Sequence, residues 1–153
     1  MKKNKKEKLE QITSIDEKPI ISNAVLIDYH KTIINDLGLI NDSMIELINT
    51  LSINYKIIIF TASTFDKKQY KKAIELLNNN EINFTKFLYV EENLGNDVDT
   101  KLALYQSISS KYKVKFLIDN NKKVVKEFVK LGIYGLRAKC PIELKPRLND
   151  NSK

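Results

Sequence analysis

The sequence predicts an α/β protein in which a mainly parallel sheet is covered by helices on both faces. Short, nearly all-apolar runs such as residues 24–28 (AVLID) and 56–60 (KIIIF) are typical of strands buried on both sides. Segments with apolar residues at helical spacing separate these runs, and the two kinds alternate along the chain. We therefore expect a three-layer, Rossmann-like domain. No cap domain is expected, because no extra domain lies between residues 61 and 101.

Five strands are expected from runs of mainly apolar residues. They are residues 24–28, 56–60, 87–90, 114–118 and 133–137. In a parallel sheet with right-handed crossovers, the carboxyl ends of the strands meet at one edge, and ligands bind there.

Four helices are expected between the strands. The first is capped by Asn41 or Asp42, whose side chains can accept a hydrogen bond from the start of a helix. The second opens at Asp66 and ends at the asparagine run 78–80. The remaining two cover residues 98–111 and 124–131, and Gly132 stands where a C-terminal cap is expected.

Length and composition favour a single domain of residues 21–138 between polar segments 1–20 and 139–153. Residues 1–10 and 137–153 each carry a net charge of +3, so most of the overall charge of +7 lies near the two ends of the sequence. Basic ends either only aid solubility or speed the encounter with a polyanion such as nucleic acid. The single cysteine, Cys140, excludes an intrachain disulfide, and no apolar run reaches the length of a signal or a membrane span. We therefore expect a cytoplasmic protein with no membrane partner.

Polar side chains follow three of the expected strands. Asp28, Thr61 and Asp119 stand at the ends of the first, second and fourth strands, and Lys101 near a helix start can reach the same edge. Two buried carboxylates would resist ionising unless a cation lay between them, and Mg²⁺ prefers carboxylate and phosphate oxygens. A lysine and a hydroxyl beside the metal suit a phosphoryl group. The sequence thus predicts a site for Mg²⁺ and phosphate.

Four segments carry a resemblance to a known family. VLIDYHKT, IIIFT, DVDTK and FLIDNN resemble, in order, the motifs of the haloacid dehalogenase-like phosphatase superfamily, over residues 24–137. The stretch 96–136 is also similar to the phosphatase domain of polynucleotide kinase-phosphatases. The resemblance implies a capless magnesium-dependent phosphomonoesterase that forms an aspartyl-phosphate.

The same resemblance implies a role for each site residue. Asp28 would be the nucleophile, and Mg²⁺ would be held by Asp28, Asp119 and the main-chain carbonyl of His30. Thr61, Ala62 and Lys101 would bind the phosphoryl group, with Lys101 also screening charge between nucleophile and phosphate.

The first motif departs from the family pattern at two positions. The family has a second aspartate, which protonates the leaving group and activates water, where this chain has His30. The imidazole could replace that acid and base, its presence could make the enzyme slow or inactive, or it could serve a different transfer reaction. Lys31 replaces a glycine and is expected to crowd the turn.

The favoured function is hydrolysis of a phosphate monoester, with a nucleic-acid 3′-phosphate or a nucleotide as candidate substrates. The alternative is a catalytically silent module of the same fold that engages nucleic acid or protein. A receiver-like signalling domain would share the sheet, but no acidic pair lies directly before the first strand. The sequence leaves oligomeric state open.

Four further residues keep two interpretations each. Asn120 either supports the metal and phosphate or caps the next helix, and Tyr29 either stacks a base or packs in the loop. Ser63 and Thr64 are expected in a loop, with phosphate contact as the other option.

Overall fold

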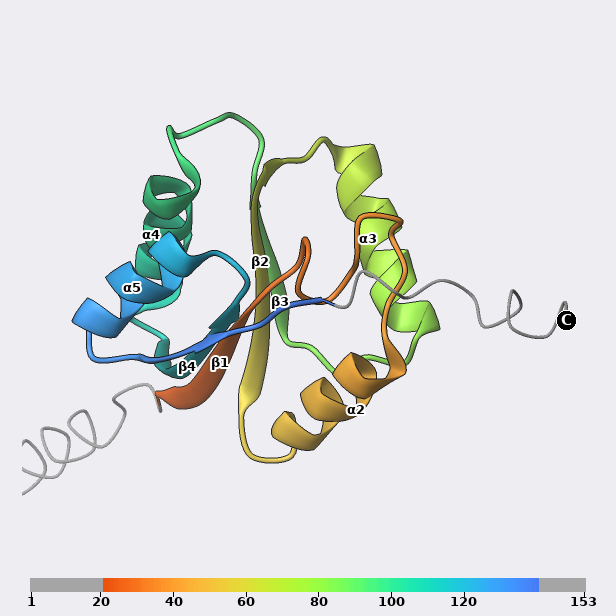
Figure 1. Ribbon diagram of the computed structural model, residues 1–153, viewed down its shortest axis with the longest axis horizontal. Helices are drawn as coiled ribbons and strands as arrows, with labels where there is room; N and C mark the ends of the chain where they lie inside the picture. The colour runs from red at the N-terminus through yellow and green to blue at the C-terminus, as the bar shows by residue number, and fades with distance from the viewer. Residues whose placement is uncertain (1–20, 141–153) are drawn as a thin grey trace, which may run out of the picture.

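The computed structural model describes residues 21–140 and confirms the α/β fold (Figure 1). Its sheet has five strands in the order β3-β2-β1-β4-β5, and every neighbouring pair is parallel. The strands are β1 (Ser22–Asp28), β2 (Lys56–Thr64), β3 (Lys86–Val90), β4 (Tyr112–Asp119) and β5 (Tyr134–Arg137). Of the expected terminal segments, residues 1–20 and all but the first two residues of 139–153 lie outside the described residues.

Two helices cover each face of the sheet. They are α2 (Asp42–Leu51) and α3 (Lys67–Asn79) on one face, and α4 (Asp97–Ile108) and α5 (Lys122–Lys130) on the other. Ile48, Ala73 and Leu77 from the first pair are buried in one apolar cluster with β1 and β2 residues. Leu104 and Phe128 from the second pair are buried in a separate cluster on the opposite face.

Side-chain caps fix where the helices begin. Asn41 rather than Asp42 caps α2, accepting a hydrogen bond from the Ser43 amide. Asp66 caps α3 as expected, within a reciprocal capping box with Gln69. Gly132 follows the end of α5 with a φ of 83°, a conformation that favours glycine.

Four strands run further than the apolar runs indicate, and of these β2 and β4 extend at their carboxyl ends. β2 continues to Thr64, with an irregular register against β3 after Phe60, so the expectation that Ser63 and Thr64 lie in a loop is wrong. β4 gains residues at both ends, and its register shifts between Ala24 and Val25 of β1. Both extensions contain polar residues, which an apolar-run criterion excludes.

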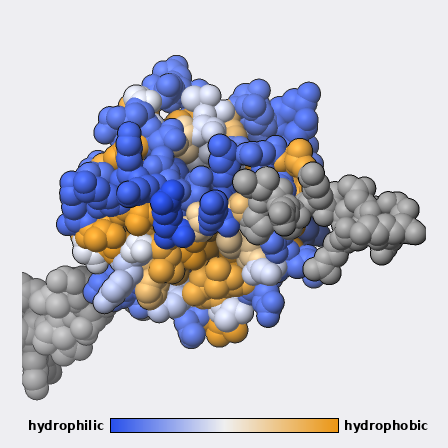
Figure 2. Space-filling view, viewed as in Figure 1, coloured by the Kyte–Doolittle hydropathy of each residue, from blue (hydrophilic) through white to orange (hydrophobic). Residues whose placement is uncertain are grey.

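One side of the edge strand β5 is left uncovered. A Cβ on Gly135 would lie 2.6 Å from Val125 of α5, so Gly135 faces that helix. Tyr134 and Leu136 point the other way and are 74% and 55% exposed. In Figure 2, hydrophobic atoms gather on the lower part of the face shown. Within residues 21–140, no helix is long and apolar enough to cross a membrane.

Candidate active site

The site is built around the ammonium group of Lys101. Its Nζ lies 2.9 Å from Asp28 Oδ1 and 2.6 Å from Asp119 Oδ2, so the two carboxylates share one cation. Sheet order explains the meeting, because β1 and β4 are neighbours and both carboxylates stand at their carboxyl ends. All three side chains are almost fully buried.

Lys101 is held in place by α4, which covers one face of the sheet. Lys101, Leu104 and Ile108 recur at helical spacing and form the buried stripe of that helix. The ammonium also lies 5.1 Å from the centre of the Phe60 ring. Burial alone would lower the pKa of Lys101, but the charges of Asp28 and Asp119 raise it above its usual range, which keeps the amine protonated.

Asp28 is 3% exposed and has a second hydrogen-bond partner. The Thr32 hydroxyl donates to Asp28 Oδ2 at 2.9 Å. Burial raises the pKa of Asp28 to about 7, and the Asp119 charge adds to this, although the Lys101 charge opposes both. The site therefore resists a second negative charge beside Asp119, as expected for paired carboxylates.

Asp119 is held by the start of the following helix. The Asn121 amide donates to Asp119 Oδ1 at 2.8 Å, and the Asn121 side chain accepts from the Lys123 and Val124 amides. Asn121 therefore caps α5, and the expectation that Asn120 could do so is wrong. The cap lies one residue later because β4 extends through Asp119.

Thr61 is buried in β2, the strand that lies next to β1. It follows Phe60, which lies opposite Asp28 in the β1–β2 register, and its hydroxyl accepts from the Ser63 amide at 3.2 Å. Thr61 thus stands inside β2 rather than at its end, level with the carboxyl end of β1. Ala62, the next residue, is partly exposed.

The turn after β1 carries both departures from the family pattern. Tyr29 is 4% exposed and packs edge-on against Phe87, so it belongs to the core and cannot stack a base. Lys31 has a φ of 62°, in the left-handed region that favours glycine. The expected crowding therefore takes the form of an unfavourable backbone conformation.

His30 is a polar side chain of the site, and one of its ring nitrogens lacks a hydrogen-bond partner within residues 21–140. Its Nε2 is buried and has no hydrogen-bond partner among the described residues. The ring packs against Tyr29 and Phe65, with centroid distances of 5.0 and 5.7 Å. Burial, followed by the charge of Lys101, lowers the pKa of His30, so the imidazole is neutral near pH 7.

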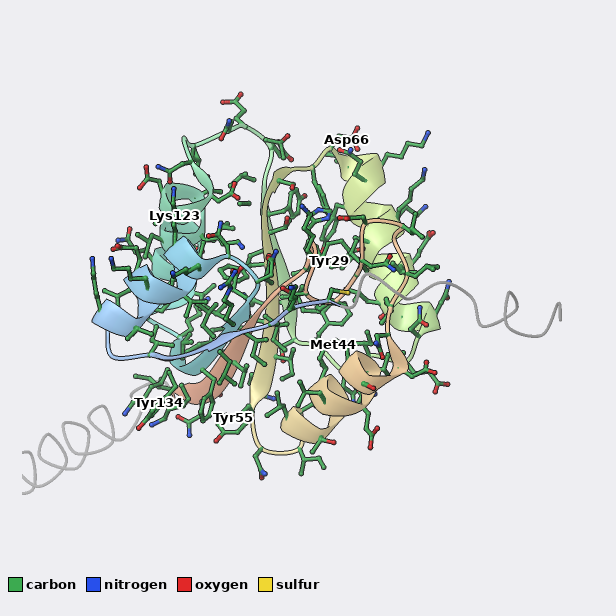
Figure 3. All side chains as sticks on the ribbon, viewed as in Figure 1. Tyr29, Met44, Tyr55, Asp66, Lys123 and Tyr134 are labelled. Atoms are coloured by element: carbon green, nitrogen blue, oxygen red, sulfur yellow. The ribbon has the colours of Figure 1, made fainter. Side chains whose placement is uncertain are left out.

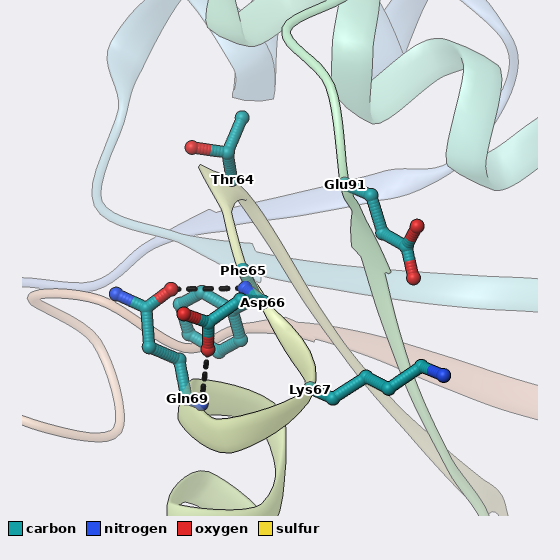
Figure 4. Close-up of a pocket in the computed structure, with 6 residues that line it drawn as sticks. All are labelled: Thr64, Phe65, Asp66, Lys67, Gln69 and Glu91. Carbon is teal, nitrogen blue, oxygen red and sulfur yellow. Dashed lines mark hydrogen bonds between the residues drawn. The ribbon is translucent and has the colours of Figure 1, made fainter.

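An open hollow of about 400 Å³ adjoins the site beyond Phe65 (Figure 4). It lies between the end of β2, the start of α3 and the residue after β3. Its lining is Thr64, Phe65, Asp66, Lys67, Gln69 and Glu91. The buried carboxylates do not line it, and Phe65 separates the hollow from His30.

The donor set suits magnesium. Within residues 21–140, no group of three or more histidine, cysteine, aspartate and glutamate side chains could hold a metal ion. Asp28 and Asp119 are the two carboxylates of the site, and a cation held by them would take its remaining ligands from main-chain, substrate or solvent oxygens. Mg²⁺ is the cation that accepts one or two carboxylates and keeps several waters.

Sequence reasoning missed three residues of the site. The Thr32 hydroxyl donates a hydrogen bond to Asp28. A hydroxyl side chain four residues after Asp28, in the same turn, was the feature of the sequence that could have indicated this contact. Asn121 positions Asp119, a role that depended on the true end of β4. Thr100 is 1% exposed, and its hydroxyl has no partner within the described part of the chain; no sequence pattern indicated this.

Comparisons with known proteins support the fold. No known protein family and no curated protein matches the sequence. A chain of the Pnkp1/Rnl/Hen1 complex is similar, with a TM-score of 0.68 and 20% identity over 79% of this chain and 47% of that chain. A chain of the Pnkp1/Rnl/Hen1 RNA repair complex gives 0.67 and 21%, over 77% and 42%. This chain therefore spans less than half of either neighbour.

Proposed function

We propose that this protein is a magnesium-dependent phosphomonoesterase in which Asp28 is the nucleophile. The observation that carries the proposal is the buried Asp28–Lys101–Asp119 arrangement at the carboxyl edge of the sheet. Such an edge is where ligands bind in open parallel sheets. The likeness to chains of an RNA repair complex supports a nucleic-acid 3′-phosphate as substrate, and a nucleotide is the other candidate.

The side chains divide the reaction between them. An Asp28 carboxylate oxygen forms a bond to phosphorus while the ester P–O bond breaks, and the leaving oxygen takes a proton. Water then attacks the aspartyl-phosphate, inorganic phosphate leaves, and Asp28 is restored. Lys101 holds Asp28 in place and offsets negative charge on the phosphoryl group, and Thr61 orients that group.

A divalent cation would fit the same residues. Asp28, Asp119 and the main-chain carbonyl of His30 would hold Mg²⁺, which neutralises charge on the phosphoryl oxygens when bound. The His30 side chain is left for proton transfer. To protonate the leaving oxygen in the first step, the imidazole must first take up a proton from solvent. It is then neutral, and it accepts a proton from the water that attacks the aspartyl-phosphate in the second step.

A second candidate function has its own support. Asp28 is only 3% exposed, and position 30 lacks the carboxylate that the resembling family uses. Both observations favour a catalytically silent module that keeps the fold and the charged centre. Such a module would bind magnesium or phosphate without turnover.

Hydrolysis of an aryl phosphate with and without Mg²⁺ separates the two functions. We expect magnesium-dependent release of phosphate by the natural protein and none by Asp28→Asn. Calorimetric titration of Mg²⁺ provides a readout independent of turnover, and Asp119→Asn should abolish that binding. Magnesium binding without hydrolysis would establish the silent module, and hydrolysis by Asp28→Asn would refute the assigned nucleophile.

A further inference from the structure

Charge is divided unequally along the carboxyl edge of the sheet. Residues 121–140 carry six basic and one acidic side chain, a net charge of +5. Residues 91–100, which lead from β3 into α4, carry four acidic side chains and no basic one. α4 and α5 lie next to each other on one face of the sheet (Figure 1), so the contrast falls within one side of the molecule.

The basic residues surround the strand end that supplies Asp119. The Asn121 amide bonds to the Asp119 side chain, which places the start of α5 at the site. Asp119 also lies opposite Arg137 of β5, and the Ala138 amide donates to its main-chain carbonyl at 2.9 Å. We call the resulting set the α5–β5 basic surface. It consists of Lys122, Lys123, Lys126, Arg137 and Lys139.

The α5–β5 basic surface is available to a ligand. All five side chains are exposed, and Figure 3 labels Lys123 at the beginning of α5. The ion pairs of the described chain are the two at Lys101 and one between Lys130 and Glu127, so none of the five is paired there. Lys122 and Lys126 are spaced by about 6 Å along the helix axis, which lets them engage successive anionic groups.

The neighbouring acidic segment determines on which side of the site a polyanion can bind. Glu91, Glu92, Asp97 and Asp99 are exposed on the other side of the site. A polyanion is repelled from that side and attracted toward α5 and β5. Closely spaced phosphates on a flexible chain match a row of unpaired cations, whereas one small phosphate ester needs only the buried centre.

We propose that the α5–β5 basic surface holds the backbone of a single-stranded nucleic acid whose terminal phosphate lies at Asp28. The end-phosphate part of this inference rests on the proposed function. The strand leaves the site between α5 and the end of β5, away from the start of α4. Its contacts go to phosphates, so binding depends on salt and little on base sequence.

Binding of a fluorescent oligonucleotide ending in a 3′-hydroxyl tests the surface without any hydrolysis. We compare the natural protein, Lys122→Gln/Lys123→Gln, and the matched control Lys71→Gln/Lys72→Gln on the exposed side of α3. The first variant should weaken binding about tenfold and reduce the slope of log K against log salt by about one to two. The control should bind within about twofold of the natural protein.

Equal losses in the two variants would overturn the proposal, because they would show only a general charge effect. No binding of DNA or RNA oligonucleotides by the natural protein at low salt would also overturn it, and would favour an acidic protein as partner. Thermal unfolding of both variants shows whether a loss comes from misfolding. Lys126→Gln, away from the helix start, is then the second variant and should weaken binding severalfold.

Hydrolysis separates failure of the surface from failure of the proposed function. For Lys122→Gln/Lys123→Gln, the ratio of kcat/KM for a 3′-phosphorylated oligonucleotide to that for an aryl phosphate should fall about tenfold. An unchanged ratio would refute the path of the strand. If the natural protein hydrolyses neither ester but loses oligonucleotide binding in this variant, the surface stands and the phosphatase function fails.

Discussion

The strands β1 and β4 each end in a carboxylate that bonds to Lys101, yet the turns that follow the two strands are built in opposite ways. The turn after β4 is relaxed, since Asn121 both bonds to Asp119 and caps α5. The turn after β1 contains the left-handed Lys31 and the unpartnered Nε2 of His30. Strained backbone and unsatisfied polar groups tend to concentrate at functional sites. The comparison indicates that the sheet sets the positions of the two carboxylates, whereas the residues that would decide the proposed chemistry lie in the turn after β1.

Asp28→Asn gives the largest expected effect, because it removes the proposed nucleophile. Phosphate release should disappear, with the fold retained. In the presence of a chelator, the melting temperature of the variant also tests how the charge of Asp28 affects stability. The folded-state pKa of Asp28, about 7, lies above its unfolded value of 3.8, so the folded state binds this proton more tightly.

The sign of the pH effect follows from that difference. Ionising Asp28 costs stability as pH rises from about 4 to about 7, and asparagine does not titrate. The melting temperature of Asp28→Asn relative to the natural protein should therefore rise between pH 5 and pH 8. A relative fall would mean that the Lys101 pairing outweighs burial at this carboxylate.

His30 variants should give the second-largest effect. His30→Ala should reduce kcat by about 10²–10⁴-fold if the imidazole transfers the proton, with little change in magnesium binding. Because burial and Lys101 lower the pKa of His30, the dependence of rate on pH should lie below the usual range for histidine. Equal rates for the natural protein and His30→Ala would exclude a catalytic histidine. A faster His30→Asp would show that the natural residue impairs the site.

Asn121→Ala probes the relaxed turn. Loss of this cap should lower the free energy of unfolding by about 1 kcal/mol, measured by urea denaturation. Asn41→Ala, which removes the cap of α2 away from the site, is the matched control and should cost a similar amount. Only Asn121→Ala should reduce hydrolysis, since only that turn positions Asp119. Equal rates of hydrolysis for Asn121→Ala and Asn41→Ala would show that the Asn121 cap does not position Asp119 for the reaction.

Lys31→Gly gives the smallest expected effect. Glycine adopts positive φ without penalty. The free energy of unfolding should therefore increase by about 0.5–1 kcal/mol, after allowance for the more flexible unfolded chain. Glu81→Gly, at a φ of 56° outside the site, should gain a similar amount. A loss at Lys31 with a gain at Glu81 would show that Lys31 makes a stabilising contact that offsets its backbone cost.

The sequence anticipated the sheet well because its strands are buried on both faces. Apolar runs located the neighbourhoods of Asp28 and Asp119, and alternation with helices placed both at one edge. It misplaced Thr61 relative to the end of β2, because polar residues continue that strand to Thr64. A strand end is set by backbone pairing with neighbours, which local composition does not encode.

The finer parts of the site were beyond sequence reasoning for a related reason. Lys101 was expected to reach the edge, but its two bonds depend on the approach of α4 to β1 and β4. The backbone conformation of Lys31 and the unpartnered His30 nitrogen arise from packing of the whole turn. The exposed cations around Asp119 became a surface only once β5 and α5 were placed together.

The bridging ammonium also bears on how the protein folds. Lys101 is separated along the chain by 73 residues from Asp28 and by 18 from Asp119. Its bonds cannot form until β4, the fourth strand in the chain, has docked beside the first, and closing so long a loop is entropically slow. Partly folded chains therefore hold two ordinary, solvated carboxylates and an independent lysine. The buried ion-pair centre is acquired when β4 docks, and an opening that parts β1 from β4 removes it.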